Sequence, residues 1–257
     1  MTKQKREMYS TDLTDAQWQF IKKTLQYPNR KRKHCLRTIW NAVLYVVKTG
    51  CQWRFLPNDF PKWQLVYYYF RKWIELEEFD ELLEKLRGKV RVKIGQNALP
   101  SLGIMDSQSV RRGNNRSLNG IDGNKKVKGI KRHVIVDKNG FLIAIMITVA
   151  NIHDGQAALQ LMRVLKNLWS SVKVILADGG YRGEIIEQIK RNFDYLLQIT
   201  LRTDRNIFQI QPKRWVIERT FSWFDNDRRL CRHYELLMET AEEMVKLSAI
   251  KLLLSKI

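Results

Sequence analysis

Cysteines and long apolar runs are scarce in this chain of 257 residues. Its 3 cysteines, Cys35, Cys51 and Cys231, are far apart and include no Cys-x-x-Cys pair, which argues against a disulfide framework and a zinc ribbon. We expect buried, reduced thiols. The longest apolar runs, residues 42–47 and 141–150, are far shorter than the roughly 18 residues that a membrane-spanning helix needs. The sequence therefore argues against a membrane protein, and its basic N-terminal segment without an apolar stretch favours a cytoplasmic location.

Acidic residues are few compared with basic ones, because 26 Asp and Glu stand against 46 Lys and Arg, for a net charge of +20. The excess is spread evenly, with +10 on residues 1–99 and +10 on residues 100–257, so it does not form a detachable tail. A positive potential along the whole body suits a long polyanion, and phosphate contacts supply the salt-dependent part of DNA affinity. The charge alone also fits a ribosomal or general nucleic-acid packing protein.

Residues 1–95 show helical periodicity. Thr14 and Gln17 have the spacing of a capping box, and Gly50 is placed to end a second helix. The expected helices span residues 14–27, 34–48, 61–74 and 75–87. Basic and aromatic residues on the third helix give the outline of a helix-turn-helix DNA reader, although a helical bundle without DNA has the same pattern. We expect this part to fold by itself and to contact DNA through Lys62, Arg71 and Lys72.

The periodicity changes after a polar hinge at residues 95–100. Short apolar runs now predict strands, separated by helices and by one long polar loop at residues 107–128, which we expect to be disordered without DNA. The expected strands are 102–106, 129–137, 141–150, 172–177 and 195–200, and the expected helices are 155–169, 182–191, 213–234 and 235–255. This order predicts an α/β fold, a mixed sheet with helices on both faces.

Three carboxylates stand out in so basic a chain. Asp106 and Asp178 each end a predicted strand, where ligands collect in open sheets, and Glu218 lies on a helix among apolar residues. Each has an ordinary structural alternative, a turn or helix cap for the aspartates and a surface ion pair for the glutamate. Taken together, three carboxylates without His or Cys suit Mg²⁺ or Mn²⁺, and two such ions can activate the attacking hydroxyl and stabilise the leaving oxygen at a phosphodiester.

These motifs occur in an order that resembles a known family. The sequence is similar to the DDE transposases of bacterial insertion sequences, specifically the insertion sequence 5 family within the wider insertion sequence 4-like superfamily. The matching segments are residues 9–18, 50–57, 106–110, 128–133, 150–154, 176–183 and 215–221.

The resemblance implies a helix-turn-helix-like DNA-binding domain at residues 1–95 and a ribonuclease H-like catalytic domain at residues 96–257. It implies that Asp106, Asp178 and Glu218 are the catalytic, metal-binding triad, with two Mg²⁺ or Mn²⁺ ions. The implied activity is binding to the terminal inverted repeats, cleavage of the transposon ends and joining of the 3′-hydroxyl to target DNA. The implied partners are double-stranded DNA and further copies of the chain, in a homodimer or higher oligomer. A catalytically silent or domesticated DNA-binding derivative is the alternative.

Two positions depart from the family pattern around the last glutamate. Arg214 and Glu218 fit, but Gln211 stands at the Tyr position and Asp225 at the Lys position, so other cations further along, including Arg232, would have to hold the DNA end. Tyr181 and Arg182 could orient the scissile phosphate, whereas Trp215 and Trp223 are expected in the core. The remaining expected DNA contacts are Arg111, Arg112, Lys125, Lys126, Lys128, Lys131, Arg132, Arg182, Arg214, Arg219, Arg228 and Arg229.

Overall fold

The computed structural model describes residues 8–113, 116–168, 171–200 and 215–257, and its N-terminal part is helical. The elements of this part are α1 (Asp15–Thr24), α2 (Leu36–Thr49), η1 (Trp53–Phe55), α3 (Trp63–Glu75) and α4 (Glu78–Lys93). The predicted capping box is present, because the Thr14 side chain accepts a hydrogen bond from the Gln17 backbone and the Gln17 side chain accepts one from the Thr14 backbone. Gly50 ends α2 with φ 69, a left-handed conformation that favours glycine.

Aromatic side chains fill the interior of the helical part. Trp40 of α2 stacks on Trp73 of α3 with ring centroids 4.7 Å apart, and Phe79 of α4 meets Trp40 edge-on at 5.6 Å. All three rings are buried. The aromatic face of α3 is therefore mainly packing surface, as its spacing predicted, and the packing of these large rings orders α2, α3 and α4 as one layer.

The second part of the chain forms one mixed sheet. Its strands are β1 (Leu102–Arg111), β2 (Gly120–Asp122), β3 (Val127–Val136), β4 (Leu142–Val149), β5 (Val174–Ala177) and β6 (Leu196–Ile199). The central strand β1 is antiparallel to β3 and parallel to β5, β5 is parallel to β6, and β3 pairs on its other edge with β2 and β4. Antiparallel strands on one side of β1 and parallel strands on the other are the ribonuclease H-like arrangement, so the predicted fold class is confirmed.

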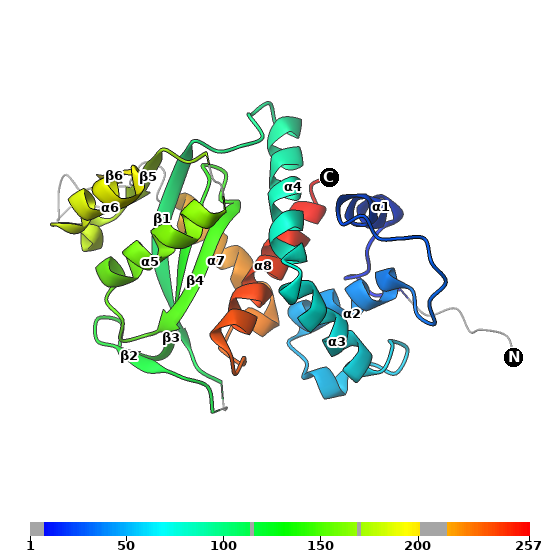
Figure 1. The fold of residues 1–257 in the computed structure, drawn as a ribbon. Coiled ribbons are helices and arrows are strands. Elements are labelled where there is room, and N and C mark those ends of the chain that lie inside the picture. The colour runs from blue at the N-terminus through cyan, green and yellow to red at the C-terminus, as the bar shows by residue number, and fades with distance from the viewer. Residues whose placement is uncertain (1–7, 114–115, 169–170, 201–214) are drawn as a thin grey trace, which may run out of the picture.

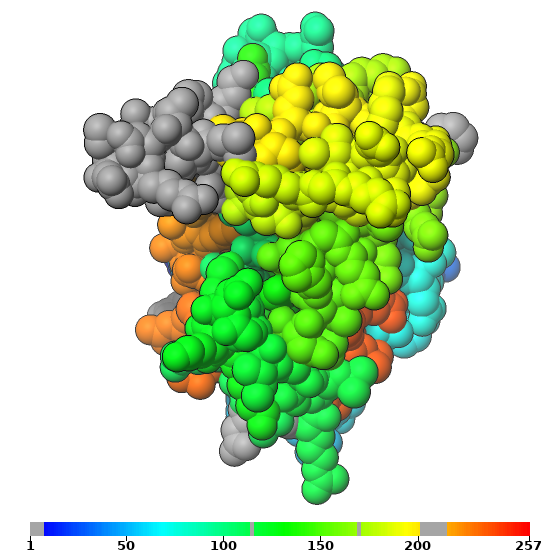
Figure 2. Space-filling view, turned by 90° about the vertical axis from the view of Figure 1, so that its left-hand side faces the viewer, coloured from blue at the N-terminus to red at the C-terminus, as the bar shows by residue number. Residues whose placement is uncertain are grey.

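Helices cover both faces of the sheet (Figure 1). The elements that follow the first four strands, apart from β5 and β6, are α5 (Asp154–Asn167), η2 (Gly179–Tyr181), α6 (Ile185–Phe193), α7 (Trp215–Asp225), η3 (Arg228–Leu230) and α8 (Met238–Leu254). On one face, α5 and α6 enclose an apolar cluster with Met105 and Ile175, and Figure 2 shows these two helices together on that side of the molecule. On the opposite face, Ile104 and Val134 belong to the core that contains α7 and α8.

The helical part and the sheet share one apolar core. The last helix, α8, packs against both α4 and β4, and it stands between them in Figure 1. Leu86 of α4, Ile145 of β4 and Ile250 of α8 are members of a single buried cluster. The helical part, through α4, is therefore packed against α8 and β4 across the boundary expected near residue 95.

The strand β1 is longer than the sequence predicted. We expected it to end at Asp106 and to be followed by a disordered loop, but its pairing with β3 continues to Arg111 opposite Gly129, and β2 lies within the same expected loop. The prediction of one long loop is therefore wrong in both places. The physical reason is that Ser107 donates to Asp154 at the start of α5 and Ser109 donates to Asp122 of β2, so a polar strand satisfies its side chains without apolar packing.

Two further expectations are wrong. The single helix expected over 213–234 ends at Asp225, because the buried Asp227 accepts hydrogen bonds from Ser248 and Lys251 of α8 and draws the chain into a turn. Cys35 and Cys231 are exposed and Cys51 is half-buried, so the thiols are not core residues. Among the helices of the described ranges, none combines the length and apolarity that crossing a membrane requires.

Candidate active site on the mixed sheet

Asp106 and Asp178 lie side by side on neighbouring strands. Asp106 is part of β1, and Asp178 directly follows β5, which runs parallel to β1. The register places Ile104 opposite Leu176, so the residues two positions further along, the two aspartates, stand at the same level of the sheet. Sequence reasoning predicted two carboxylates at one sheet edge, and the strand order brings these two together.

Both aspartates belong to the side of the sheet that α7 covers. Side chains alternate along a strand, and Ile104 of β1 and Leu176 of β5 contact the core that includes α7 and α8. Each carboxylate is half-buried and is oriented locally by a backbone N–H, from Ser107 to Asp106 Oδ1 at 2.7 Å and from Gly180 to Asp178 Oδ1 at 2.9 Å. The two side chains thus face one region between the sheet and α7.

Glu218 lies on the first turn of α7, and this helix packs against β1. Its neighbours Val216 and Ile217 are buried, while Glu218 itself is exposed. In the described part of the chain, no three His, Cys, Asp or Glu side chains converge closely enough to hold one ion. The structure therefore brings two of the three expected ligands together and places the third on the helix that covers the same side of the sheet.

The expected DNA contacts separate into exposed, half-buried and buried cations. Arg71, Arg112 and Arg219 are half-buried, and Arg71 lies 3.8 Å from Glu239 of α8. Arg214 lies outside the described residues. Lys125 is exposed, but its Nζ donates to the Ser107 carbonyl at 3.2 Å. The other exposed members are Lys62, Lys72, Arg111, Lys126, Lys128, Arg182 and Arg228.

Three of the expected DNA contacts are buried and have internal partners instead. Lys131 lies 3.2 Å from Asp154, Arg132 donates to the Leu230 carbonyl at 2.7 Å, and Arg229 Nε lies 2.6 Å from Glu235. Burial lowers the pKa of Arg132 to about 10, because the charged form loses hydration. These side chains stabilise the sheet and the α7–η3 corner, so the structure does not offer them to DNA. Sequence alone could not separate them from their exposed neighbours.

A comparison with protein families identifies both parts of the chain. Residues 13–83 match the model described as "Putative transposase of IS4/5 family", and residues 97–250 match the model described as "Transposase DDE domain". The chain belongs to the transposase DDE domain family. The match spans β1 to α8, so it includes Asp106, Asp178 and Glu218.

The chain is also similar to two individual proteins. The chain is 29% identical over 114 residues to the "Putative transposase for insertion sequence element IS402" of Burkholderia cepacia, an alignment that covers 42% of this chain and 54% of the relative. The chain thus matches about half of that relative's length. Among solved structures, the "Crystal structure of the Mos1 Strand Transfer Complex" aligns with 66% of this chain and 59% of its own, at 13% identity and a TM-score of 0.25.

The donor chemistry of the aspartate pair fits a divalent cation of the magnesium type. Asp106 and Asp178 offer carboxylate oxygens only, and such an ion is bound through one or two carboxylates, waters and substrate phosphate. Soft thiolate ligands are missing from this pair, which disfavours a zinc centre. Asp106 and Asp178 would hold the ion, and Glu218 is a carboxylate on the helix α7, which packs against β1.

A stack of side chains on α7 was not foreseen from the sequence. The guanidinium carbon of Arg219 lies 4.5 Å from the ring centroid of Trp215 and 4.8 Å from that of Trp223. Trp215, expected in the core, is 48% exposed. Arg219 also donates to the carbonyl of Asn139 at 2.8 Å, so its charge is used within the protein. The spacing of four residues between these three positions was the available signal.

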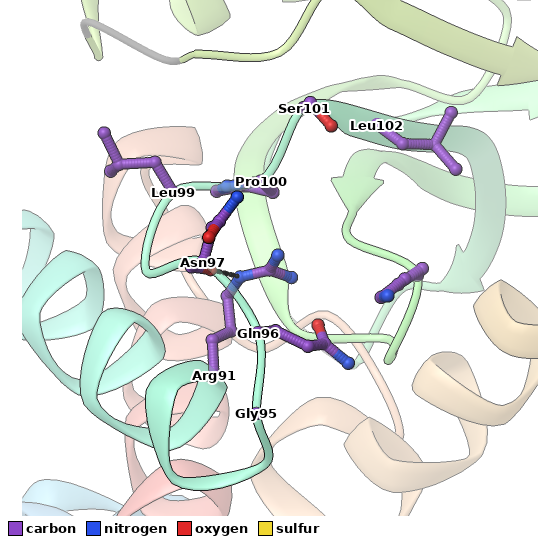
Figure 3. Close-up of a pocket in the computed structure, with 9 residues that line it drawn as sticks. Arg91, Gly95, Gln96, Asn97, Leu99, Pro100, Ser101 and Leu102 are labelled. Atoms are coloured by element: carbon purple, nitrogen blue, oxygen red, sulfur yellow. Dashed lines mark hydrogen bonds between the residues drawn. The ribbon is translucent and has the colours of Figure 1, made fainter.

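A polar crevice at the hinge is separate from the aspartate pair. It has a volume of about 310 Å³ and is lined from Arg91 of α4 through the linker to Leu102 and by Lys138 (Figure 3). Arg91 Nε donates to the Asn97 carbonyl at 2.8 Å across it. This crevice lies at the start of β1, before the strand reaches Asp106, and its residues order the linker between the helical part and the sheet.

Proposed function

We propose that this chain is a DNA transposase that binds the terminal inverted repeats of its insertion sequence, hydrolyses the phosphodiester at the transposon ends and joins the 3′-hydroxyl to target DNA. The observation that carries the proposal is the placement of Asp106 and Asp178 at one level of neighbouring parallel strands, within the segment that matches the transposase DDE domain. A ribosomal or packing protein has no reason to pair carboxylates there.

The chain's own residues have distinct parts in this proposal. Asp106 and Asp178 hold a divalent ion, Mg²⁺ or Mn²⁺, and Glu218 supplies a third carboxylate from α7. Such an ion, when bound, increases the reactivity of the attacking hydroxyl and stabilises charge on the leaving oxygen. Exposed cations near β1, including Arg111, Lys126 and Lys128, hold the DNA backbone, and the helices of residues 1–95 bind the repeats. Two ends must be brought together, which favours a dimer or larger assembly.

Cleavage of a labelled transposon end in Mg²⁺, Mn²⁺ or EDTA tests this function. We expect a nick with a 3′-hydroxyl in either metal and none in EDTA. The variant D106N should bind the end and fail to nick it. D194N is a matched control, because Asp194 is an exposed aspartate at the end of α6 that pairs with the surface residue Lys190, and it should nick normally. Nicking by D106N at the wild-type rate would remove the assignment of the site.

A further inference from the structure

A cluster of buried polar side chains lies on the other face of β1, directly behind the aspartate pair. Because neighbours on a strand point to opposite faces, Ser107 points away from α7 and toward α5. Ser107 Oγ donates to Asp154 Oδ1 at 3.0 Å, and Lys131 Nζ of β3 lies 3.2 Å from the same oxygen. Asp154 is the first residue of α5, so β1, β3 and the start of this helix meet at one carboxylate.

The Lys131 ammonium has several polar partners. Its ammonium also donates to the carbonyl of Ile152 at 3.0 Å and lies 3.8 Å from Asp122, which accepts a hydrogen bond from Ser109 of β1. The Lys131 side chain is only 6% exposed. A buried cation without a partner is strongly unfavourable. Lys131 therefore favours the conformation in which the Asp154 carboxylate stays beside its ammonium.

Tyr181 connects the same cluster to Asp178. It lies three residues after Asp178 in η2, is 2% exposed and packs in the apolar cluster of α5. Its backbone N–H donates to the Asp178 carbonyl at 3.2 Å, and η2 packs against α5, so the turn that carries Asp178 is fixed to this helix. The expectation that Tyr181 orients the scissile phosphate is wrong for a direct contact, because a side chain buried this far does not reach a phosphate at the surface.

Both members of the aspartate pair are therefore attached to the start of α5. Asp106 is adjacent in sequence to Ser107, which bonds to Asp154, and Asp178 begins the short turn that Tyr181 fixes against the helix. Two carboxylates bind one small ion only when their separation suits its short metal–oxygen distances. Contacts to α5 can set that separation without touching the ion.

We propose that Asp154 is a positioning residue, which with Ser107, Lys131 and Tyr181 fixes the spacing of Asp106 and Asp178 and so sets their affinity for a divalent cation. The inference rests on the proposed function, since it assumes that this pair holds the ion. His133 and Thr148 complete the surroundings, with His133 Nδ1 3.9 Å from Asp154 and its Nε2 2.9 Å from the Thr148 hydroxyl. Groups that orient metal ligands typically change metal affinity about 10–100-fold when removed.

Binding of Mn²⁺ to the full chain, measured by electron paramagnetic resonance, tests this role without any reaction. We expect D154N to bind Mn²⁺ about 10-fold more weakly, and S107A, which removes only the hydroxyl, to be weakened by a smaller factor. D106N should lose the site. The matched control is D15N, because Asp15 is also the first residue of a helix and pairs with Arg37, but in the helical part of the chain. D15N should bind as the wild type does.

A second measurement separates positioning from a structural defect. In variants whose circular dichroism and DNA affinity are unchanged, nicking by D154N should need about 10-fold more Mg²⁺ for half-maximal rate and approach the wild-type rate at saturating Mg²⁺. Wild-type Mn²⁺ affinity in both D154N and S107A would overturn the inference and leave the proposed function intact. Mn²⁺ binding that D106N does not alter would overturn the proposed site and the inference together.

Discussion

Arg91 of α4 forms a buried ion pair with Asp137, at the turn that joins β3 and β4. Both side chains are almost fully shielded from solvent, at 6% and 0% exposure. The Asp137 carboxylate also accepts the backbone N–H groups of Asn139 at 2.8 Å and Phe141 at 3.0 Å, so it shapes the turn while it binds the helix. This contact fastens the helical part of the chain to the sheet.

Removal of Arg91 should therefore be strongly destabilising. R91A leaves Asp137 charged and buried, and loss of one partner of such a pair costs about 3–5 kcal/mol. The control K190A breaks the exposed pair of Lys190 with Asp194 and should leave the unfolding midpoint nearly unchanged, because solvent screens such a pair. Urea unfolding of both variants measures the difference, and equal midpoints would show that the buried pair is unimportant.

A fragment of residues 8–96 should fold poorly. The sequence suggested that the helical part is independent, but Leu86 and Val90 of α4 are buried in the core shared with the sheet and α8. Without these partners the fragment exposes a large apolar surface and loses the Arg91 contact. We expect a broad, weakly cooperative thermal transition and binding of a hydrophobic dye, against a sharp transition for the full chain. A sharp transition of the fragment would support an independent domain.

Glu218 should be essential for cleavage and unimportant for binding. E218Q keeps the shape of the side chain and removes its charge, so it weakens the ion site without altering phosphate contacts. We expect nicking to fall at least about 100-fold while the gel-shift affinity for the transposon end stays within twofold. The neighbouring acidic residue of α7, Asp225, provides the control D225N. Comparable nicking by E218Q and D225N would remove Glu218 from the site.

Lys126 and Lys128 should contribute to DNA affinity, whereas Lys85 should not. Both residues of the first pair are exposed beside the end of β1, and Lys85 lines a groove of α4 together with Glu77, Glu81 and Glu84. The double variant K126Q/K128Q should reduce the slope of log affinity against log salt by roughly 0.9 for each lost phosphate contact, or about 2 in total. The control K85Q should keep the slope. An unchanged slope in the double variant would show that these lysines lie in a solvated loop and make no phosphate contacts.

Stability should depend on pH through Glu242 of α8. Burial raises its pKa to about 7, while its Oε1 accepts the backbone N–H of Ile147 on β4 at 2.8 Å. A carboxyl group whose pKa is raised on folding stabilises the protein fully below its unfolded pKa near 4.5, and this contribution is lost as the pH rises through about 7. E242Q stays neutral and should gain about 1–3 kcal/mol over the wild type between pH 5 and pH 8. Urea unfolding at both pH values checks this, and a constant difference would contradict it.

The sequence by itself determined most of the helices and strands and the chemistry of the Asp106–Asp178 pair. Helical spacing and the Thr14 capping box are local features, and so are the short apolar runs that end in Asp106 and Asp178. The order of strands and helices along the chain predicted a mixed sheet, since parallel neighbours need a crossover connection between them, and the structure supplied the order of the strands within it. A fold class and two adjacent carboxylates could therefore be predicted from one chain.

Only the tertiary structure decided which charges are inside. Lys131, Arg132 and Arg229 are as basic as Lys126 and Lys128, but they have partners from distant segments: Asp154 of α5, the Leu230 carbonyl of η3 and the Cys51 carbonyl after α2. The length of β1 depended in the same way on acidic partners in α5 and β2, and the end of α7 depended on contacts between Asp227 and α8. Burial of a charge is a property of long-range packing, because its cost is offset only by groups that the fold brings near it.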